Sequence, residues 1–244
     1  MRPSVPDIRI TDPQDAELAA YRALAGQAVL GLIFGLLAPL AMIDPMLWAA
    51  PVLGAMFSWW ALRRIKKNAP ALAGRKIAMA GLTLSLLFLA AAPTDWLVYR
   101  GMIRDEARQF SALWFKYLAQ HQPHKAHQLT TTPQSRRPLD DNLWAFYRNG
   151  PRVREDMEGY VKSPLVRTLL ALGPKAQVRF YQTTDQARDN GNDQVAQCYA
   201  VTYDEGGERK SFFVLVRMIR LKLKDGGAGW RITQAEGGVR PEGW

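Results

Sequence analysis

The sequence predicts a membrane region of three helical spans followed by an α+β domain, and three observations support this prediction. Three apolar runs with very few charges lie between residues 24 and 98. A short segment with six basic residues, RRIKKNAPALAGRK at 63–76, separates the second run from the third. After residue 100 the apolar residues recur first at spacings of three and four and then in alternation, which is typical of helices followed by strands.

The charge distribution divides the chain into three parts. Residues 1–22 contain three basic and four acidic side chains, residues 23–99 six and two, and residues 100–244 contain 23 and 16. The differences, −1, +4 and +7, sum to the net charge of +10. We expect a tail, a membrane region and a globular domain in these three ranges. The single cysteine, Cys198, excludes an intramolecular disulfide, so cysteine pairing indicates no compartment.

The first span is predicted at 24–43, where about 20 residues without a charge match a hydrocarbon core of about 30 Å. Asp44 and Pro45 form a short polar turn before the second span at 46–62, whose tryptophans near both ends are typical of a membrane interface. The third span is predicted at 77–98. The alternative is a buried helical hairpin in a soluble protein, but little else in the chain could cover so much apolar surface.

The basic segment at 63–76 predicts the orientation of these spans. Short loops rich in Lys and Arg stay on the cytoplasmic side. We therefore expect a multi-pass protein of the cell (inner) membrane, with a cytoplasmic N-terminus and everything after Tyr99 extracytoplasmic. No early apolar stretch indicates a cleavable signal peptide, so we expect the tail to be retained. Asp12 and Pro13 are typical of the start of a short helix.

Small residues recur at four-residue spacing in all three predicted spans. Such pairs allow helix backbones to approach closely. They predict packing within the bundle, while contact between copies of the chain, or no special role, stays open. The pairs are Gly31 with Gly35, Ala50 with Gly54, Gly54 with Ser58, and Gly81 with Ser85.

The predicted membrane region also resembles a known family over residues 25–90. The second apolar run ends in ALRRI at 61–65, and the third opens as GRKIAMAG at 74–81. These motifs resemble the bacterial membrane region called domain of unknown function 4190. Trp59 and Ser85 stand where that family usually continues with glycine, so the resemblance is to a divergent member. The family has no established activity to carry over.

The last part of the chain changes from a helical to a strand pattern. An apolar stripe predicts a long amphipathic helix that Pro123 stops; it consists of Ile103, Ala107, Phe110, Trp114, Tyr117 and Leu118. Further helices are predicted at 126–129, 139–148, 152–161 and 165–172. Strands are predicted at 176–184, 193–204, 210–224 and 229–235, separated by turn sequences rich in Asp, Asn and Gly. Helices followed by an antiparallel meander predict an α+β domain with the sheet wrapped on the long helix.

This order of elements, over about residues 101–240, resembles the cone-shaped nuclear transport factor 2-like fold, which is itself similar to the cystatin-like folds. The resemblance implies helices packed on a curved antiparallel sheet. In such relatives the fold serves either as a ligand-binding cone, sometimes with catalysis, or as an extracytoplasmic interaction domain on a membrane anchor, as in the scaffold subunits of type IV secretion systems. Fold alone does not choose between these roles.

Histidines are the first candidates for chemistry. His121, His124 and His127 are close enough in sequence to suggest a metal site, because histidine is a common ligand. Pro123 interrupts the helix, so the three rings need not share a face, and neither Cys nor a carboxylate lies within the cluster. We favour a turn surface over a metal site or a catalytic histidine.

Carboxylates and the cysteine are the next candidates. A general base in an apolar cavity would be one of Asp140, Asp141, Glu155, Asp156 and Glu158. The first two stand where a helix N-terminus is expected, and the last three are interleaved with arginines, so capping and surface roles are favoured. We expect Cys198 to be a small buried apolar residue rather than a nucleophile.

Basic residues on the third predicted strand raise the question of nucleic acid. They are Arg217, Arg220, Lys222 and Lys224, and Tyr181 and Trp230 could add stacking surfaces. The predicted orientation separates this domain from cytoplasmic nucleic acid. We therefore expect a surface that faces anionic lipid headgroups or an acidic partner, and no nucleic acid.

These observations predict a membrane-anchored extracytoplasmic binding or assembly module. We assign no catalytic, cofactor-binding or metal-binding residue and expect no cofactor. The expected partners are the lipid bilayer and a protein or apolar ligand of the C-terminal domain, with homo-oligomers left open. The alternative is a membrane-tethered enzyme with an active site in the cone. A pocket lined by an isolated acid or histidine would favour the enzyme, whereas an apolar or filled cone would favour the binding module.

Overall fold

The computed structural model describes residues 23–67 and 72–240. The chain divides into two compact units, Met1–Tyr99 and Arg100–Trp244. The predicted tail at 1–22, with its helix start at Asp12 and Pro13, lies outside the described residues.

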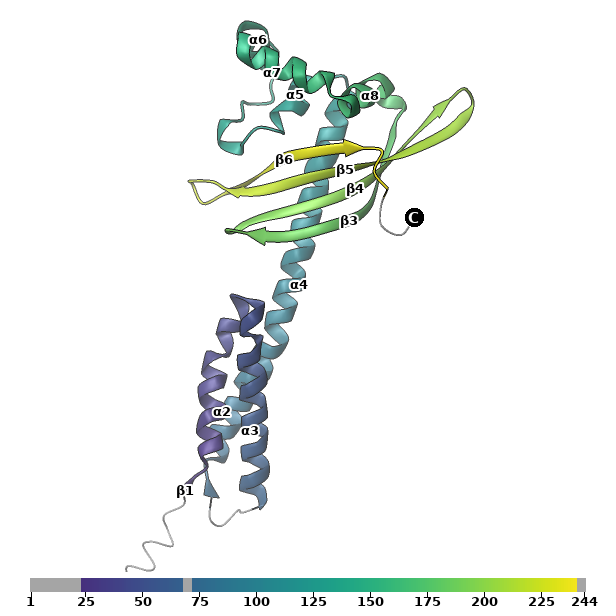
Figure 1. The fold of residues 1–244 in the computed structure, drawn as a ribbon. Coiled ribbons are helices and arrows are strands. Elements are labelled where there is room, and N and C mark those ends of the chain that lie inside the picture. The colour runs from purple at the N-terminus through teal and green to yellow at the C-terminus, as the bar shows by residue number, and fades with distance from the viewer. Residues whose placement is uncertain (1–22, 68–71, 241–244) are drawn as a thin grey trace, which may run out of the picture. The chain divides into compact units, whose positions relative to one another are not determined.

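The first unit is a helical bundle (Figure 1). In chain order its elements are β1 (Ala23–Leu24), α2 (Gly26–Leu37), the 3-10 helices η1 (Ala38–Met42) and η2 (Pro45–Trp48), α3 (Ala49–Lys67), β2 (Leu72–Ala73) and the first part of α4 (Arg75–Ala119). The two short strands pair in parallel and hold the start of α2 beside the start of α4.

Within residues 23–67 and 72–240, two helices are long and apolar enough to cross a membrane, rather than the three clear spans predicted. They are Pro45–Lys67 and Arg75–Ala119, and the apolar helix Gly26–Met42 is shorter. Near Pro39 the first apolar run tightens from α2 into η1, because proline has no backbone N–H for the regular α-helical ladder. The Asp44 side chain accepts a hydrogen bond from Met46 N at 2.7 Å and fixes the turn that follows.

The third apolar run does not end at residue 98, as predicted, but continues as α4 through Pro93 to Ala119. Proline inside a helix removes one hydrogen bond and usually kinks or breaks the helix. Here alanines precede it and Thr94 Oγ1 donates to Ala90 O at 2.8 Å, so a nearby carbonyl gains a partner. The prediction of a separate helix beginning near residue 101 is therefore wrong.

Small residues pack the three helices of this unit against one another. A Cβ on Gly31 would lie 2.3 Å from Ser58 Oγ, and one on Gly54 would lie 2.3 Å from Ser85 Oγ. A Cβ on Gly81 would lie 2.8 Å from the backbone of Gly31. Of the three alternatives for the small-residue pairs, packing within the bundle is thus observed.

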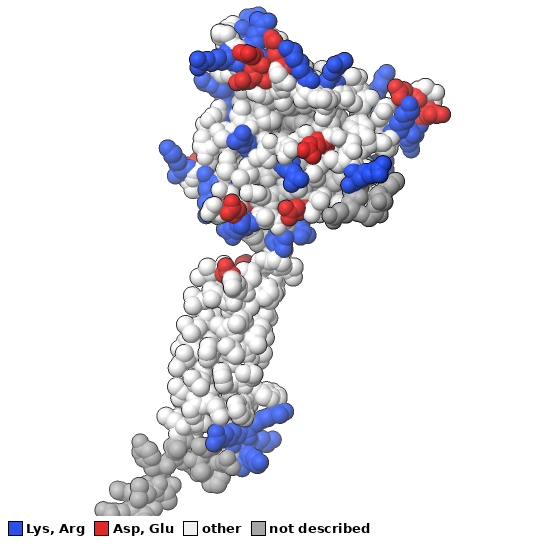
Figure 2. Space-filling model, in the orientation of Figure 1, with Lys and Arg blue, Asp and Glu red and all other residues white. Residues whose placement is uncertain are grey.

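Large apolar side chains cover the outside of this bundle. Ile43 is 76% exposed and Met46 88% exposed, and Leu36, Trp59, Trp60 and Leu87 are each more than half exposed. Figure 2 shows a flank almost free of charge, with basic side chains gathered at one end. Arg64, Lys66 and Lys67 lie in the last turn of α3, and Arg75 and Lys76 begin α4. A continuous apolar surface of this kind is typical of contact with lipid.

The second unit has the predicted α+β order. After the last part of α4 come α5 (Pro123–Gln128), η3 (Pro133–Ser135), α6 (Asn142–Asn149), α7 (Pro151–Lys162), α8 (Pro164–Leu172) and η4 (Gly173–Lys175). The strands β3 (Gln177–Asp189), β4 (Asn192–Glu205), β5 (Glu208–Lys222) and β6 (Ala228–Gly237) follow. They form one open antiparallel sheet in the order β3-β4-β5-β6.

The sheet packs one face on α4, as Figure 1 shows. Alternation along each strand produces this face. Val195 lies opposite Met218, and Tyr199 lies opposite Val214. All four are almost fully buried. The sheet is therefore half-buried, with an outer face that carries polar and charged side chains between apolar ones.

The α4 stripe forms the centre of this core. Ile103, Ala107, Trp114 and Leu118 are 0–1% exposed. Trp114 Nε1 donates to Tyr160 Oη at 2.7 Å, so the indole also joins α4 to α7. Charged groups add a second attachment, since Glu106 Oε2 lies 2.9 Å from Arg220 Nε and accepts from Trp230 Nε1 at 3.1 Å.

We predict that Gly81→Ala destabilises the bundle of the first unit. The new methyl group would meet the Gly31 backbone at 2.8 Å, which cannot move like a flexible side chain. Overpacking of this kind costs about 1–3 kcal/mol. The measurement is the thermal unfolding of the purified chain in detergent. Gly26→Ala is the matched control, because nothing lies within 4 Å of a Cβ at that position. Equal melting temperatures for the two variants would contradict the observed packing.

Candidate functional site

A cavity of about 340 Å³ lies between α4 and β3 in the second unit. Small-molecule pockets usually measure about 300–1,000 Å³, so this cavity suits a small ligand. We call it the α4–β3 pocket. It is lined by Arg108, Ala112, Phe115, Lys116 and Ala119 from α4, by Ala176 just before β3, by Val178 and Phe180 from the start of β3, and by Tyr199 from β4.

Helical and strand periodicity together place these side chains. Arg108, Ala112 and Lys116 follow one another at four-residue spacing, so they share a face of α4 beside the buried stripe. On β3, Val178 and Phe180 are two residues apart and therefore point to the same side of the sheet. The small side chain of Ala112 leaves the space that the pocket occupies between the helix and the strand.

Tyr199 forms part of the pocket wall, and its hydroxyl group is fully engaged. The hydroxyl donates to Gln197 Oε1 at 2.6 Å and contacts Ser111 Oγ. Gln197 Nε2 in turn donates to Arg104 O at 2.9 Å, which ties this network to α4. Burial raises the pKa of Tyr199 to about 12. The phenol therefore stays protonated at neutral pH and is a structural donor rather than a base.

Two basic side chains line the pocket and no acid does. The Arg108 guanidinium carbon lies 4.8 Å from the centre of the Phe180 ring, so the guanidinium makes a cation–π contact with this wall. Lys116 lies two turns further along α4. Among the residues that the structure describes, neither cation has an ion-pair partner. The pocket thus combines an apolar interior with an uncompensated positive charge.

The three histidines do not converge. A Cβ on Gly173 would lie 2.8 Å from His121 Nε2, so the His121 ring lies against that glycine. His124 packs edge-on against Trp144, with ring centres 5.3 Å apart. His127 turns to a third neighbour, Tyr147. No metal-binding group of three His, Cys, Asp or Glu side chains occurs within residues 23–67 and 72–240.

His127 belongs to a hydrogen-bonded aromatic cluster that the sequence did not reveal. Its Nδ1 lies 2.7 Å from Tyr147 Oη, which accepts from Gln128 Nε2 at 2.7 Å. The Tyr147 hydroxyl thus bridges the Gln128 amide and the His127 ring. Burial lowers the pKa of His127, and the nearby Asp156 carboxylate partly opposes this. The Tyr160 ring completes the cluster, 5.1 Å from the histidine ring.

The candidate carboxylates lie away from the α4–β3 pocket. Asp140 Oδ1 accepts from Asn142 N at 3.0 Å at the start of α6. Glu158 pairs with Arg154 at 3.0 Å on the exposed side of α7. The side chains of Asp141, Glu155 and Asp156 are exposed. Cys198 is buried in β4, and burial raises the pKa of its thiol. None of these groups has the surroundings of a buried general base or an activated nucleophile.

The basic residues of β5 do not form one platform. Arg220 turns toward α4 and pairs with Glu106, as described above. Trp230 is opposite Arg220 and is buried there. Arg217 lies on the outer face of the sheet instead. The odd spacing between positions 217 and 220 sends the two arginines to opposite faces, because strand side chains alternate.

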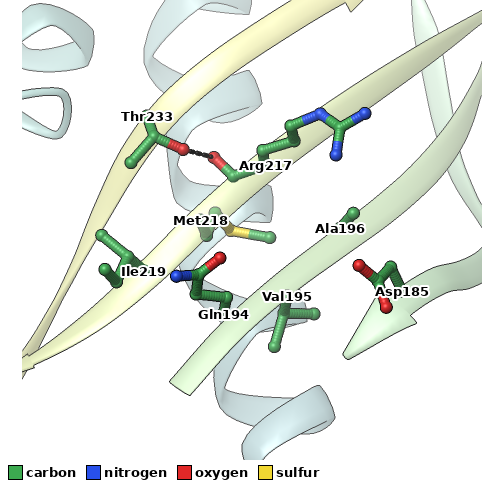
Figure 3. Close-up of a pocket in the computed structure, with 8 residues that line it drawn as sticks. All are labelled: Asp185, Gln194, Val195, Ala196, Arg217, Met218, Ile219 and Thr233. Carbon is green, nitrogen blue, oxygen red and sulfur yellow. Dashed lines mark hydrogen bonds between the residues drawn. The ribbon is translucent and has the colours of Figure 1, made fainter. Parts of the chain in front are cut away.

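Figure 3 shows a second, smaller hollow, of about 150 Å³, on the strands of the sheet. Ala196 lies at its centre, paired across the sheet with Asp185 on one side and Arg217 on the other. Thr233 Oγ1 donates to Arg217 O at 3.1 Å. A carboxylate and a guanidinium flank this hollow, so it offers no net charge and less room than the α4–β3 pocket.

Comparison of the chain with protein-family models, with curated proteins and with solved structures found no match. The site must therefore be interpreted from its own residues.

The sequence predicted part of the α4–β3 pocket but not the pocket itself. The predicted strand at 176–184 contains Val178 and Phe180, and the sheet was expected to wrap on the long helix. The sequence analysis did not predict Arg108, Ala112 and Lys116 as site residues, because they lie beside the apolar stripe of the long helix and not in it. The pattern that indicates them is a cation, an alanine and a cation at four-residue spacing, which places the three side chains on one face of a helix.

We predict that acid weakens the folding of the second unit through His127. Its pKa in the folded protein is lower than the ordinary 6.5, so the unfolded chain binds the proton more readily. The stability contributed by neutral His127 is present above about pH 6.5 and is lost as the pH falls through the folded pKa. Denaturant unfolding of the chain between pH 7.5 and 5 measures this slope. His127→Asn, which keeps a hydrogen-bonding amide near the Nδ1 position, should flatten it; an unchanged slope would contradict the assignment.

Proposed function

We propose that this protein is a three-span protein of the cell membrane whose C-terminal domain is an extracytoplasmic binding or assembly module. Two helices long and apolar enough to cross a membrane support the membrane part, with Gly26–Met42 as a shorter third span. The exposed apolar flank of the bundle supports it as well. Helices followed by a four-stranded sheet are compatible with a nuclear transport factor 2-like cone, and the resemblance to domain of unknown function 4190 would account for the membrane part.

The distribution of basic residues supports the orientation. Arg63, Arg64, Lys66 and Lys67 end α3, and Arg75 and Lys76 begin α4. All six therefore belong to one short connection between two apolar helices, the type of loop that stays in the cytoplasm. This orientation has α3 entering the cytoplasm, α4 leaving it, and the second unit outside.

The α4–β3 pocket is the observation that carries the binding role. It is open, its wall is mainly apolar, and it is large enough for a small molecule. The lining contains neither an acid nor a histidine, which are the groups most often used in general acid–base catalysis. The one ionisable hydroxyl, Tyr199, stays protonated at neutral pH. We therefore prefer ligand binding over catalysis for this domain.

Reporter fusions test the orientation. An enzyme that is active only after export should be active when fused after Trp244, and one that is active only in the cytoplasm should be active when inserted near Asn68. Neutralising Arg63, Arg64, Lys66 and Lys67 together should produce mixed orientations, because charges in short loops set the bias. Neutralising Arg152 and Arg154, which lie on α7 far from the apolar helices in sequence, is the control. The reverse pattern of reporter activity would overturn the proposed topology.

Binding of a small neutral aromatic probe tests the pocket. We expect 5-fluoroindole to bind the chain in phosphatidylcholine nanodiscs, with a saturable change in its fluorine NMR signal. Ala112→Leu should abolish this change, since the larger side chain fills the cavity, and Ala112 is exposed enough to be replaced without disturbing the core. Ala187→Leu, an exposed position on β3 outside the pocket, should leave it unchanged. An identical response from the Ala112→Leu variant would remove the support for a binding role.

A further inference from the structure

We propose that the α4–β3 pocket selects small amphipathic anions, meaning carboxylic acids with an apolar body and one charged group, and that Arg108 binds the carboxylate. This inference rests on the proposed binding function and adds the chemical class of the ligand. It follows from three features of the pocket, namely its charge, the position of Arg108 and the mainly apolar side chains of its wall.

The charge of the pocket favours an anion. Arg108 and Lys116 line it, and the lining contains no carboxylate. Glu106 on α4 is not available to these cations in the same way, because it pairs with Arg220 on β5 and accepts a hydrogen bond from Trp230 on β6. Both cations are exposed, so an anion can reach them without displacing a carboxylate of the protein. A neutral ligand would leave this charge uncompensated.

The position of Arg108 suits it to bind a carboxylate. Its guanidinium carbon lies 4.8 Å from the Phe180 ring centre, so the aromatic face supports the guanidinium. No ion pair of Arg108 is present among the described residues, and a guanidinium can bind a carboxylate through two parallel N–H donors. The side chain is also partly fixed before binding, which lowers the entropy cost of forming that contact.

The wall of the pocket favours an apolar ligand body. Ala112, Phe115, Val178 and Phe180 present only carbon atoms from their side chains. The hydroxyl of Tyr199 is already occupied by Gln197 and Ser111. A polar anion such as inorganic phosphate would therefore lose water here without finding a second set of partners. A ligand whose apolar part lies along these residues gains from burial instead.

Lys116 contributes in a different way. It lies eight residues from Arg108, about 12 Å along the helix at 1.5 Å per residue. Arg108, and not Lys116, makes the cation–π contact with the Phe180 wall. We assign Lys116 a positioning and attracting role, and direct contact with the carboxylate to Arg108.

The experiment compares 4-phenylbutyrate with its neutral amide, 4-phenylbutanamide, by titration calorimetry. The full chain is held in phosphatidylcholine nanodiscs, and empty nanodiscs give the background. The acid should bind at least about tenfold more tightly than the amide, as expected for a charge-assisted contact worth about 1.5 kcal/mol or more. Arg108→Gln should remove this preference, and Lys116→Gln should weaken binding of the acid by less than about fivefold. Lys162→Gln, which removes an equal charge on the exposed side of α7, should have no effect.

The outcomes separate the two proposals. Equal affinity for acid and amide in the unmodified chain, or an acid preference that survives Arg108→Gln, would overturn the inference about charge. If Ala112→Leu still abolished binding in that case, the pocket would remain a binding site and the proposed function would stand. If neither compound nor 5-fluoroindole bound, both proposals would fail. The Arg108→Gln variant should melt at the same temperature as the unmodified chain, since the side chain is exposed.

Discussion

The second unit depends on the burial of one face of α4 against the sheet. Trp114 is at the centre of this contact and is completely buried. Its ring packs 4.8 Å from that of Phe115, and its indole N–H is bonded to Tyr160 on α7. One side chain therefore joins the helix, the aromatic core and the helical layer. An indole N–H left without a partner at this depth would cost about 1–3 kcal/mol. The Tyr160 hydroxyl therefore contributes to the stability of the core.

The α4–β3 pocket is a consequence of the same contact. Once the stripe containing Trp114 faces the sheet, the adjacent face of α4 must lie along β3. Alanines at 112 and 119 are too small to close that gap. The polar network of Ser111, Tyr199 and Gln197 then satisfies the hydroxyl groups that lie between stripe and pocket. Core and pocket thus share one helix, and the helix orients Arg108 as well as Trp114.

Local patterns predicted most of the secondary structure, because both helices and strands have a period that the apolar residues follow. The strand alternation identified all four strands, and proline and glycine marked the ends of α7 and α8 closely. The predictions that failed depend on tertiary contacts, which local sequence patterns do not show. The third span was expected to end at residue 98 and a separate helix to follow it, yet α4 runs without a break from Arg75 to Ala119. The pocket joins residues as far apart as Arg108 and Phe180, and no spacing in the sequence indicates that pairing. The aromatic cluster of His127 was hidden for the same reason.

The central claim, that α4 organises the second unit through Trp114, is tested most directly by truncating this side chain. We expect Trp114→Ala to lower the free energy of unfolding by about 3–5 kcal/mol. Hydrogen exchange of the β4 and β5 amides in the full chain in nanodiscs measures that energy. Trp144→Ala is the matched control, because Trp144 on α6 is 49% exposed and should cost about 1 kcal/mol or less. Equal costs for the two truncations would show that the α4 stripe is not the core.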